Sequence, residues 1–277
     1  MEKTIFEEKT HENKIYENKA YEKNAYGNKV KDKNMEIKTI IENSELEQVT
    51  FEKREELDYR ANEAYKTLRT NIQFSGDEIK VITFTSCTPN EGKSSIAFNL
   101  AVSFAQTGKK VILVDADLRK SVLAGRYKVG AVESGLSHYL SGQAELKDVM
   151  LHTDIENMDI ILAGTYSPNP AELLENKRFK NMIQTIRELY DYVIIDTPPL
   201  GSVIDTAVVA KVSDGAIMVI ESNIISYRFA QDVKRQLEKS NCRILGAILN
   251  KVPMEKKGYY GKYYGKYYGK YYGTYGE

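Results

Sequence analysis

The sequence of 277 residues contains no tryptophan and only two cysteines, Cys87 and Cys242. The two lie far apart and neither has a CxxC or CxxH partner, which argues against a disulfide framework or a zinc site and fits a reducing cytosol. No apolar run approaches the ~20 residues that span a bilayer, and the opening MEKTIFEEKT lacks the apolar core of a signal peptide. We therefore expect a cytoplasmic protein, for which any membrane association must come through a partner.

The sequence also lacks an excess of either charge. Its 39 basic and 39 acidic residues give a formal net charge of zero at pH 7. The summed charge therefore provides no attraction to nucleic acid or to an anionic membrane, and no nucleic-acid partner is expected.

Low complexity at both ends separates the chain into three regions. Residues 1–50 are rich in Glu, Asn and Lys and carry too little apolar surface to offset the entropy of ordering, so we expect a disordered tail. Residues 255–277 contain the repeat YYGKYYGKYYGKYYGTYG, where glycine at every fourth position disfavours helix and no aliphatic side chain can build a core. We expect residues 51–254 to form the one folded domain.

Strands and helices alternate along this central region. Short apolar runs, mostly rich in Val and Ile, predict strands at Ile79–Thr85, Val111–Val114, Ile160–Ala163, Tyr192–Ile195, Ala216–Ile220 and Ile244–Leu249. Amphipathic spacing predicts helices within Glu52–Phe74 and at Ser94–Gln106, Phe179–Tyr190 and Ser226–Lys239. Because the strands are hydrophobic throughout, we expect an α/β fold with a mostly parallel sheet covered by helices on both faces.

The segment Cys87-Thr-Pro-Asn-Glu-Gly-Lys-Ser94 lies between a predicted strand and a predicted helix, which is the context of a P-loop. In such a loop the backbone N–H groups and the helix N-terminus surround phosphate. We expect Lys93 to reach the β- and γ-phosphates of a nucleotide and Ser94 to offer its hydroxyl to Mg²⁺. Cys87 replaces the first glycine of the usual pattern. The predicted nucleotide contacts are Asn90, Glu91, Gly92, Lys93, Ser94 and Ser95.

Acidic residues follow two of the predicted strands. Asp115 and Asp117 end the strand at Val111–Val114, and residues two apart in a strand share one face. Asp196 ends the strand that begins at Tyr192, which is the usual place of a direct or indirect Mg²⁺ ligand in P-loop proteins. Together with the P-loop, these carboxylates predict a site for ATP and Mg²⁺ with phosphoryl-transfer chemistry.

Several segments together give the chain a specific resemblance from about Glu55 to its end. The P-loop, VILVDADLRK, YVIIDTPP, PNPAELL, ILGAILNK and the C-terminal tyrosine cluster resemble the bacterial tyrosine kinases of capsule and exopolysaccharide synthesis, in their separate cytoplasmic kinase subunit form. The resemblance implies that Lys93 acts in transfer and that Asp115 takes the proton of an incoming tyrosine, with Asp117 supporting metal or hydroxyl. It also implies Ser94, Asp117 and Asp196 as metal ligands and Asn250 at the adenine.

The resemblance further implies partners. Glu63, Lys66 and Arg69 fall on the helix motif E-x-x-R-x-x-R of the family, which packs between subunits of a homo-oligomeric ring. The three residues step around a face away from the predicted apolar stripe of their helix, and Lys66 replaces an arginine. Ser121 stands where the family often has proline. A transmembrane activator of the polysaccharide co-polymerase type, which recruits the kinase to the membrane, and a cognate phosphotyrosine phosphatase are also implied.

The C-terminal repeat supplies the expected phosphate acceptors. The resemblance implies autophosphorylation in trans, between neighbouring subunits, at Tyr259, Tyr260, Tyr263, Tyr264, Tyr267, Tyr268, Tyr271, Tyr272 and Tyr275. An alternative is that the repeat is an adhesive segment and not a substrate. The N-terminal repeat, with Tyr16, Tyr21 and Tyr26 in phase, is either a solvated tail without a specific role or a second set of phosphorylated tyrosines.

Two other functions remain open from the sequence. A partitioning or division-site ATPase has the same fold but carries an additional lysine early in its P-loop, where this chain has Thr88. The other alternative is a nucleotide-binding scaffold without transfer activity. ATP turnover without phosphotyrosine would favour the ATPase, and binding without turnover would favour the scaffold.

Overall fold

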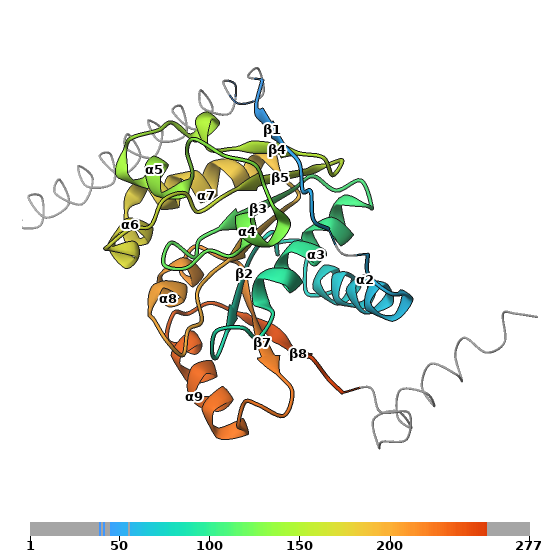
Figure 1. Ribbon diagram of the computed structural model, residues 1–277. Coiled ribbons are helices and arrows are strands. Elements are labelled where there is room, and N and C mark those ends of the chain that lie inside the picture. The colour runs from blue at the N-terminus through green and yellow to red at the C-terminus, as the bar shows by residue number, and fades with distance from the viewer. Residues whose placement is uncertain (1–38, 40, 42–44, 55, 254–277) are drawn as a thin grey trace, which may run out of the picture.

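In the computed structural model, the described residues are 39, 41, 45–54 and 56–253, and they contain one eight-stranded sheet (Figure 1). Its strands are β1 (Glu47–Val49), β2 (Val81–Ser86), β3 (Val111–Asp115), β4 (Leu151–Thr153), β5 (Met158–Ile161), β6 (Tyr192–Asp196), β7 (Gly215–Glu221) and β8 (Ile244–Asn250). The strand order is β1-β4-β5-β3-β6-β2-β7-β8, and every pair except β4 with β5 is parallel. The predicted mostly parallel sheet is confirmed.

Helices cover both faces of the sheet, as predicted (Figure 1). They are α2 (Tyr59–Gln73), α3 (Lys93–Ala105), α4 (Leu123–Tyr127), α5 (Leu136–Ser141), α6 (Pro170–Glu175), α7 (Lys177–Leu189), α8 (Asp205–Ala210) and α9 (Tyr227–Glu238), with a short 3-10 helix at Leu146–Asp148. One core joins α2, α3 and α4 to the sheet, and a second joins α5, α6 and α7 to its other face. None of the helices in this part of the chain is long and apolar enough to cross a membrane.

The two short strands β1 and β4 correct the sequence prediction. β1 lies within residues 1–50, which were predicted to be disordered, yet it pairs in parallel with β4 and buries Val49. The following chain is fixed as well, because the backbone N–H of Phe51 donates to Asp154 Oδ1 over 3.1 Å. A strand of three residues is too short to show a periodic pattern, which explains why neither strand was predicted.

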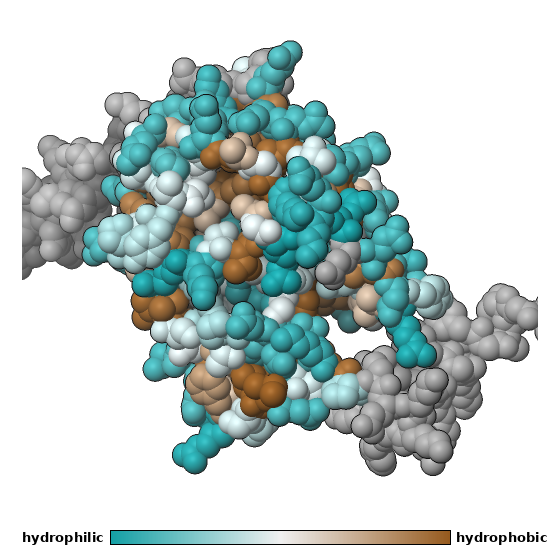
Figure 2. All heavy atoms as spheres, in the orientation of Figure 1, coloured by the Kyte–Doolittle hydropathy of each residue, from teal (hydrophilic) through white to brown (hydrophobic). Residues whose placement is uncertain are grey.

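Helix α2 begins later than the amphipathic region Glu52–Phe74 suggested. Asp58 caps α2, and its side chain accepts a hydrogen bond of 2.7 Å from the N–H of Ala61. Tyr65, Leu68 and Ile72 pack against the core as the predicted stripe. Before the cap, the backbone N–H of Lys53 donates to the Tyr127 carbonyl at the end of α4 over 3.2 Å. The face of the molecule shown in Figure 2 carries both hydrophilic and apolar side chains.

The topology determines where a site can form. β3, β6 and β2 are neighbours in the sheet and run parallel, so their carboxyl ends lie at one edge. The register pairs Asp115 directly with Asp196, and the P-loop follows β2 at the same edge. In parallel α/β sheets this edge is where ligands bind.

Candidate active site

The P-loop connects β2 to α3 in a conformation that only some residues can adopt. Asn90 and Gly92 have positive φ angles of 70° and 92°, a region that glycine, and to a lesser extent asparagine, tolerates. Gly92 directly precedes α3, whose first residues, Lys93 and Ser94, are buried. The unpaired N–H groups of the first helical turn and the helix dipole together favour an anion at this position.

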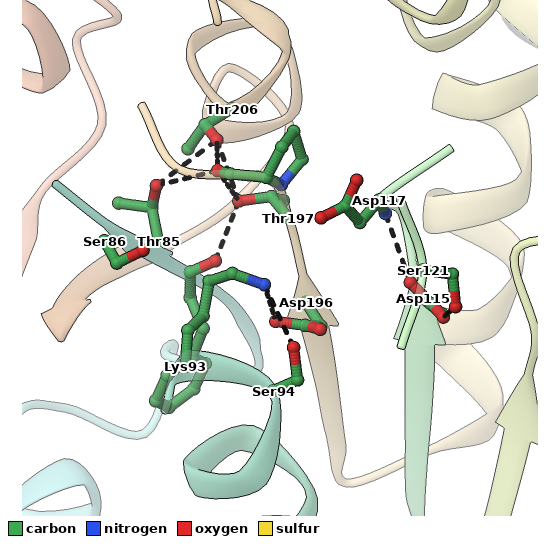
Figure 3. A network of polar contacts seen from close by, with 12 residues as sticks. Thr85, Ser86, Lys93, Ser94, Asp115, Asp117, Ser121, Asp196, Thr197 and Thr206 are labelled. Carbon is green, nitrogen blue, oxygen red and sulfur yellow. Dashed lines mark hydrogen bonds and ion pairs between the residues drawn. The ribbon is translucent and has the colours of Figure 1, made fainter. Parts of the chain in front are cut away.

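The Lys93 ammonium lies between two groups of the predicted metal and phosphate site (Figure 3). Its Nζ donates to Asp196 Oδ1 over 2.5 Å and to Ser94 Oγ over 3.2 Å. Burial raises the pKa of Asp196, and the neighbouring Lys93 opposes this shift by favouring the carboxylate. The structure therefore brings together the P-loop lysine, its serine and the acid at the end of β6, as predicted from the sequence.

Asp115 and Asp117 follow β3 and are both buried. Asp115 accepts hydrogen bonds from the Ser121 hydroxyl and, over 3.2 Å, from the backbone N–H of Asp117. Complete burial, reinforced by the charge of Asp196, raises the pKa of Asp115 to about 7, although Ser121 opposes the shift. A carboxyl group with such a pKa is suited to accept a proton at neutral pH. Asp117 lies beside it with its carboxylate directed towards Thr197 (Figure 3).

The donor atoms at this edge suit a magnesium ion. Ser94, Asp117 and Asp196 offer hydroxyl and carboxylate oxygens, the hard ligands that Mg²⁺ prefers. Among the described residues, no three acidic, histidine or cysteine side chains converge closely enough to enclose a metal by themselves. Mg²⁺ is usually held by one or two side chains together with substrate phosphates and water.

Glu91 and Asn250 lie at the P-loop, but their side chains bind the protein itself. The buried Glu91 carboxylate accepts from the N–H and, over 3.1 Å, the hydroxyl of Thr88, and from the N–H of Glu221 over 2.8 Å. The Glu91 side chain is thus occupied, and the predicted contact of Glu91 with a nucleotide could be made only by its backbone. Asn250 Nδ2 donates to the Glu91 carbonyl over 2.8 Å. Its role at the adenine stays a prediction.

Two supporting groups were missed by sequence reasoning. Buried hydroxyls of Thr85, Thr197 and Thr206 form a network with the Pro198 carbonyl and hold the loop after Asp196 against β2 (Figure 3). Arg119 donates to the buried Asp205 at the start of α8 through Nε over 2.6 Å and Nη2 over 3.0 Å. The arginine of the VDADLRK segment indicated that an acidic partner exists, but no sequence feature near Asp205 identified that residue as the partner.

The predicted subunit-contact residues of α2 do not act as one set. Lys66 pairs with Glu63 over 2.7 Å on the exposed surface. Arg69 instead donates through Nη1 to the carbonyl and hydroxyl oxygens of Ser103 in α3, over 2.5 and 2.9 Å. The expectation that all three point away from the packed face of α2 is therefore wrong for Arg69. The predicted acceptor tyrosines, residues 259–275, lie outside the described part of the chain.

Comparisons with known proteins agree with this geometry. Residues 79–244 match the family profile described as AAA domain. The chain is 43% identical over 212 residues to tyrosine-protein kinase CpsD of Streptococcus pneumoniae, an alignment that covers 76% of this chain and 93% of that protein.

Two solved structures show the same fold. The kinase domain of Escherichia coli tyrosine kinase ETK is 33% identical with a TM-score of 0.66, over 72% of this chain and 80% of that one. The septum site-determining protein MinD of Pyrococcus horikoshii, solved with Mg-ADP, is 27% identical with a TM-score of 0.56, over 64% and 72%. With its P-loop, its strand-end carboxylates and its close likeness to these kinases, the chain belongs to the bacterial tyrosine-protein kinase family.

Proposed function

We propose that this protein is an ATP- and Mg²⁺-dependent tyrosine autokinase that phosphorylates C-terminal tyrosines of a neighbouring subunit. The observation that supports it most is the pairing of Asp115 with Asp196 across β3 and β6, beside Lys93. The buried carboxyl group of Asp115 thus lies one strand away from P-loop residue Lys93, and transfer to a hydroxyl would use such a base together with a lysine that binds phosphate. A water-directed ATPase would need no separate acceptor, whereas this chain carries nine tyrosines within residues 259–275.

In the proposed reaction, different residues bind the phosphates, accept the proton and hold the metal. The P-loop N–H groups and Lys93 hold the β- and γ-phosphates and stabilise the charge of the transferred group. A tyrosine hydroxyl attacks the γ-phosphorus, its proton passes to Asp115, and the bond to the ADP oxygen breaks. Because a free phenol has a pKa of about 10, a nearby base contributes roughly 10²–10⁴-fold to the rate. Mg²⁺ held by Ser94, Asp117 and Asp196 would supply charge neutralisation of the phosphates.

The supporting contacts are consistent with positioning as the main source of catalysis. The Thr85–Thr206 hydroxyl network and the Arg119–Asp205 pair fix the two segments that follow β6 and β3. Phosphoryl transfer depends on such preorganisation more than on covalent participation. Thr88, where partitioning ATPases have a lysine, is bound to Glu91 within its own loop.

The wider role is part of the same proposal. Like the kinase family it belongs to, the protein would regulate capsular or exopolysaccharide synthesis or export. It would act as a ring of subunits that a transmembrane activator recruits to the membrane. A phosphotyrosine phosphatase would reverse the phosphorylation. The kinase domain of residues 51–254 would be extended to include β1, and residues 255–277 would be the phosphorylated tail.

Phosphosite mapping after incubation with Mg·ATP tests the function. We expect phosphate on tail tyrosines of the full chain and none when residues 255–277 are deleted. Asp115→Asn should keep ATP affinity and lose tail phosphorylation, whereas Lys93→Met should lose both. Equal phosphorylation by the Asp115→Asn variant would disprove the role of Asp115. ATP turnover without phosphotyrosine would identify an ATPase, and nucleotide binding without turnover a scaffold.

A further inference from the structure

A pocket of about 550 Å³ lies on the face that carries α3 and α4, within the ~300–1,000 Å³ of typical small-ligand sites. Strongly hydrophilic side chains gather over these two helices in the space-filling view (Figure 2). Three segments distant in the sequence form its wall. They contribute Lys53, Arg54 and Leu57 before α2, Ser95 and Asn99 of α3, and Val122, Gly125, Arg126 and Tyr127 of or beside α4.

Aromatic packing holds these walls in place. The Phe51 ring meets the Phe98 ring edge to face at 4.9 Å between centroids, and Phe98 stacks on Tyr127 at 3.9 Å. The backbone N–H of Lys53 donates to the Tyr127 carbonyl over 3.2 Å, which ties the extended segment to the end of α4. The pocket is therefore a property of the folded domain and not of one mobile side chain.

Among the residues that the structure describes, the charged side chains that line the pocket are all positive. Its described lining contains Lys53, Arg54 and Arg126 and no acidic residue. Within the part of the chain that the structure describes, none of these three cations forms an ion pair. Cations grouped around a concave site, with no ion-pair partner among the described residues, attract an anion, and two guanidinium groups suit the tetrahedral oxygens of a phosphate.

The pocket also adjoins the phosphoryl-transfer site. Ser95 lines it and directly follows Ser94 of the P-loop, and the Tyr127 hydroxyl interacts with the Ser95 side chain. Val122, Gly125 and Arg126 follow the VDADLRK segment that carries Asp115 and Asp117. A group bound in the pocket would thus lie on the Asp115 side of the P-loop, separated by the sheet order from Asn250 at the end of β8.

We infer that this pocket, which we call the Arg126 pocket, binds a phosphotyrosine in the C-terminal tail of a second copy of the chain. The inference rests on the proposed function as the source of that phosphotyrosine. The aromatic and aliphatic wall of Tyr127, Leu57 and Val122 suits the phenyl ring, and the cations suit the phosphate. Residues 255–277 contain five lysines and two glutamates, so the unmodified tail carries about +3 and is repelled by the pocket. One phosphate adds about −1.5 to −2 and creates the local complementarity.

Chain length permits this contact between subunits. The last described residue is Pro253, and Tyr275 lies 22 positions further along the chain. At ~3.3–3.6 Å per residue an extended chain of that length spans at most about 79 Å. Because tyrosines recur in every four-residue repeat and Ser95 of the pocket follows Ser94 of the P-loop, a phosphotyrosine bound in the Arg126 pocket would hold unmodified tyrosines beside the same P-loop. A first phosphorylation on the tail then accelerates the next.

Peptide binding tests the pocket separately from the kinase activity. The protein would be the full chain with Asp115→Asn, treated with alkaline phosphatase, and no ATP would be added. The probes are fluorescent peptides of residues 258–276, either unmodified, phosphorylated at Tyr267, or carrying Tyr267→Glu. We expect fluorescence anisotropy to show at least ~10-fold tighter binding of the phosphopeptide than of the other two. Equal binding of the phosphopeptide and the unmodified peptide would overturn the inference, and equal binding of the glutamate peptide would show a general acidic-segment site instead.

Two substitutions in the same background locate the binding. Arg126→Glu should weaken phosphopeptide binding ~10-fold or more by removing a charge-assisted contact. Gly125→Leu fills the pocket without changing its charge, and it should be tolerated because a Cβ at Gly125 meets no atom within 4 Å. The matched controls are Arg228→Glu on α9 and Gly130→Leu, whose Cβ also meets nothing within 4 Å. Unchanged binding in both pocket variants, or equal losses in the controls, would contradict the assignment.

The consequence for activity is measured on the otherwise unaltered chain. With Gly125→Leu, intact-mass spectrometry during incubation with Mg·ATP should show the singly phosphorylated form at a normal rate and multiply phosphorylated forms several-fold more slowly. If both classes of product appear at wild-type rates, the pocket does not order the reaction. If no chain is phosphorylated at all while the phosphopeptide still binds, the proposed function fails and the pocket assignment stands.

Discussion

The side-chain amide of Asn250 occupies the space that a Cβ on Gly92 would need. Asn250 Nδ2 lies 2.2 Å from that position, and it is held there by its hydrogen bond of 2.8 Å to the Glu91 carbonyl. Gly92 also has a φ of 92°, which side-chain-bearing residues rarely adopt. Glycine is therefore required at position 92 for two independent reasons. The backbone has a positive φ, and Asn250 at the end of β8 leaves no room for a Cβ.

This relationship predicts the effect of Gly92→Ala. The substitution should lower the free energy of unfolding by about 1–3 kcal/mol, because the backbone is strained and Asn250 must move. It should also weaken ATP binding, since the loop N–H groups shift. In an Asn250→Ala background the steric part disappears, so urea denaturation should show a smaller loss than in the wild-type background. Strictly additive losses would mean that Asn250 is not the obstacle.

The Arg119–Asp205 pair predicts a coupled loss of stability and activity. Arg119→Ala leaves the fully buried Asp205 carboxylate without its cation, and we expect a loss of about 1–3 kcal/mol, moderated because the Arg119 side chain is 38% exposed. Arg119→Lys should recover only part of this, because lysine cannot form the two parallel bonds. Asp205→Asn in the Arg119→Ala background should restore stability in urea denaturation. No such recovery would show that the pair carries no mutual stabilisation.

Cys87 is predicted to be unreactive in the folded protein. Burial, reinforced by the charge of Glu91, raises the pKa of Cys87 to about 12. At pH 8 an ordinary thiol of pKa ~8.5 is about one quarter ionised, but Cys87 remains almost wholly in the unreactive thiol form and becomes reactive only as the pH rises towards 12. Iodoacetamide at pH 8 should label it slowly in native protein and rapidly in guanidinium. Rapid labelling of native Cys87, mapped by mass spectrometry, would contradict this account.

The residues of α2 are predicted to separate stability from assembly. Arg69→Ala removes two hydrogen bonds to Ser103 and should lower the free energy of unfolding by about 1–2 kcal/mol. Lys66→Glu disrupts only an exposed pair, so its stability should stay within about 1 kcal/mol of wild type. If α2 packs between subunits, Lys66→Glu should still shift the oligomer distribution in analytical ultracentrifugation. An unchanged distribution would remove Lys66 from the proposed interface.

The sequence predicts those parts of the fold and of the site that are formed by continuous segments of the chain. The apolar runs that became β2, β3, β6 and β7 were recognisable because most of their residues are buried, and the run that became β8 was recognisable by its apolar composition although it is half exposed. The P-loop from Cys87 to Ser94 was recognisable because its glycine, lysine and serine must be consecutive to close around phosphate. Parallel pairing then required Asp115 and Asp196 to meet at one edge.

The tertiary structure decided what depends on partners distant in the sequence. Arg119 donates to Asp205, which lies 86 residues away in the sequence, and Arg69 donates to Ser103, which lies 34 residues away. β1 forms by pairing with β4, which also pairs with β5, and the buried Glu91 carboxylate binds both Thr88 in its own loop and the N–H of Glu221. By itself the sequence determined the order of the elements, the phosphate loop and the chemistry of the strand ends, since backbone periodicity and turn formation are local. Side-chain packing decided which side chains face one another, and it formed the Arg126 pocket from three separate segments. Such packing is settled only when the whole chain has folded.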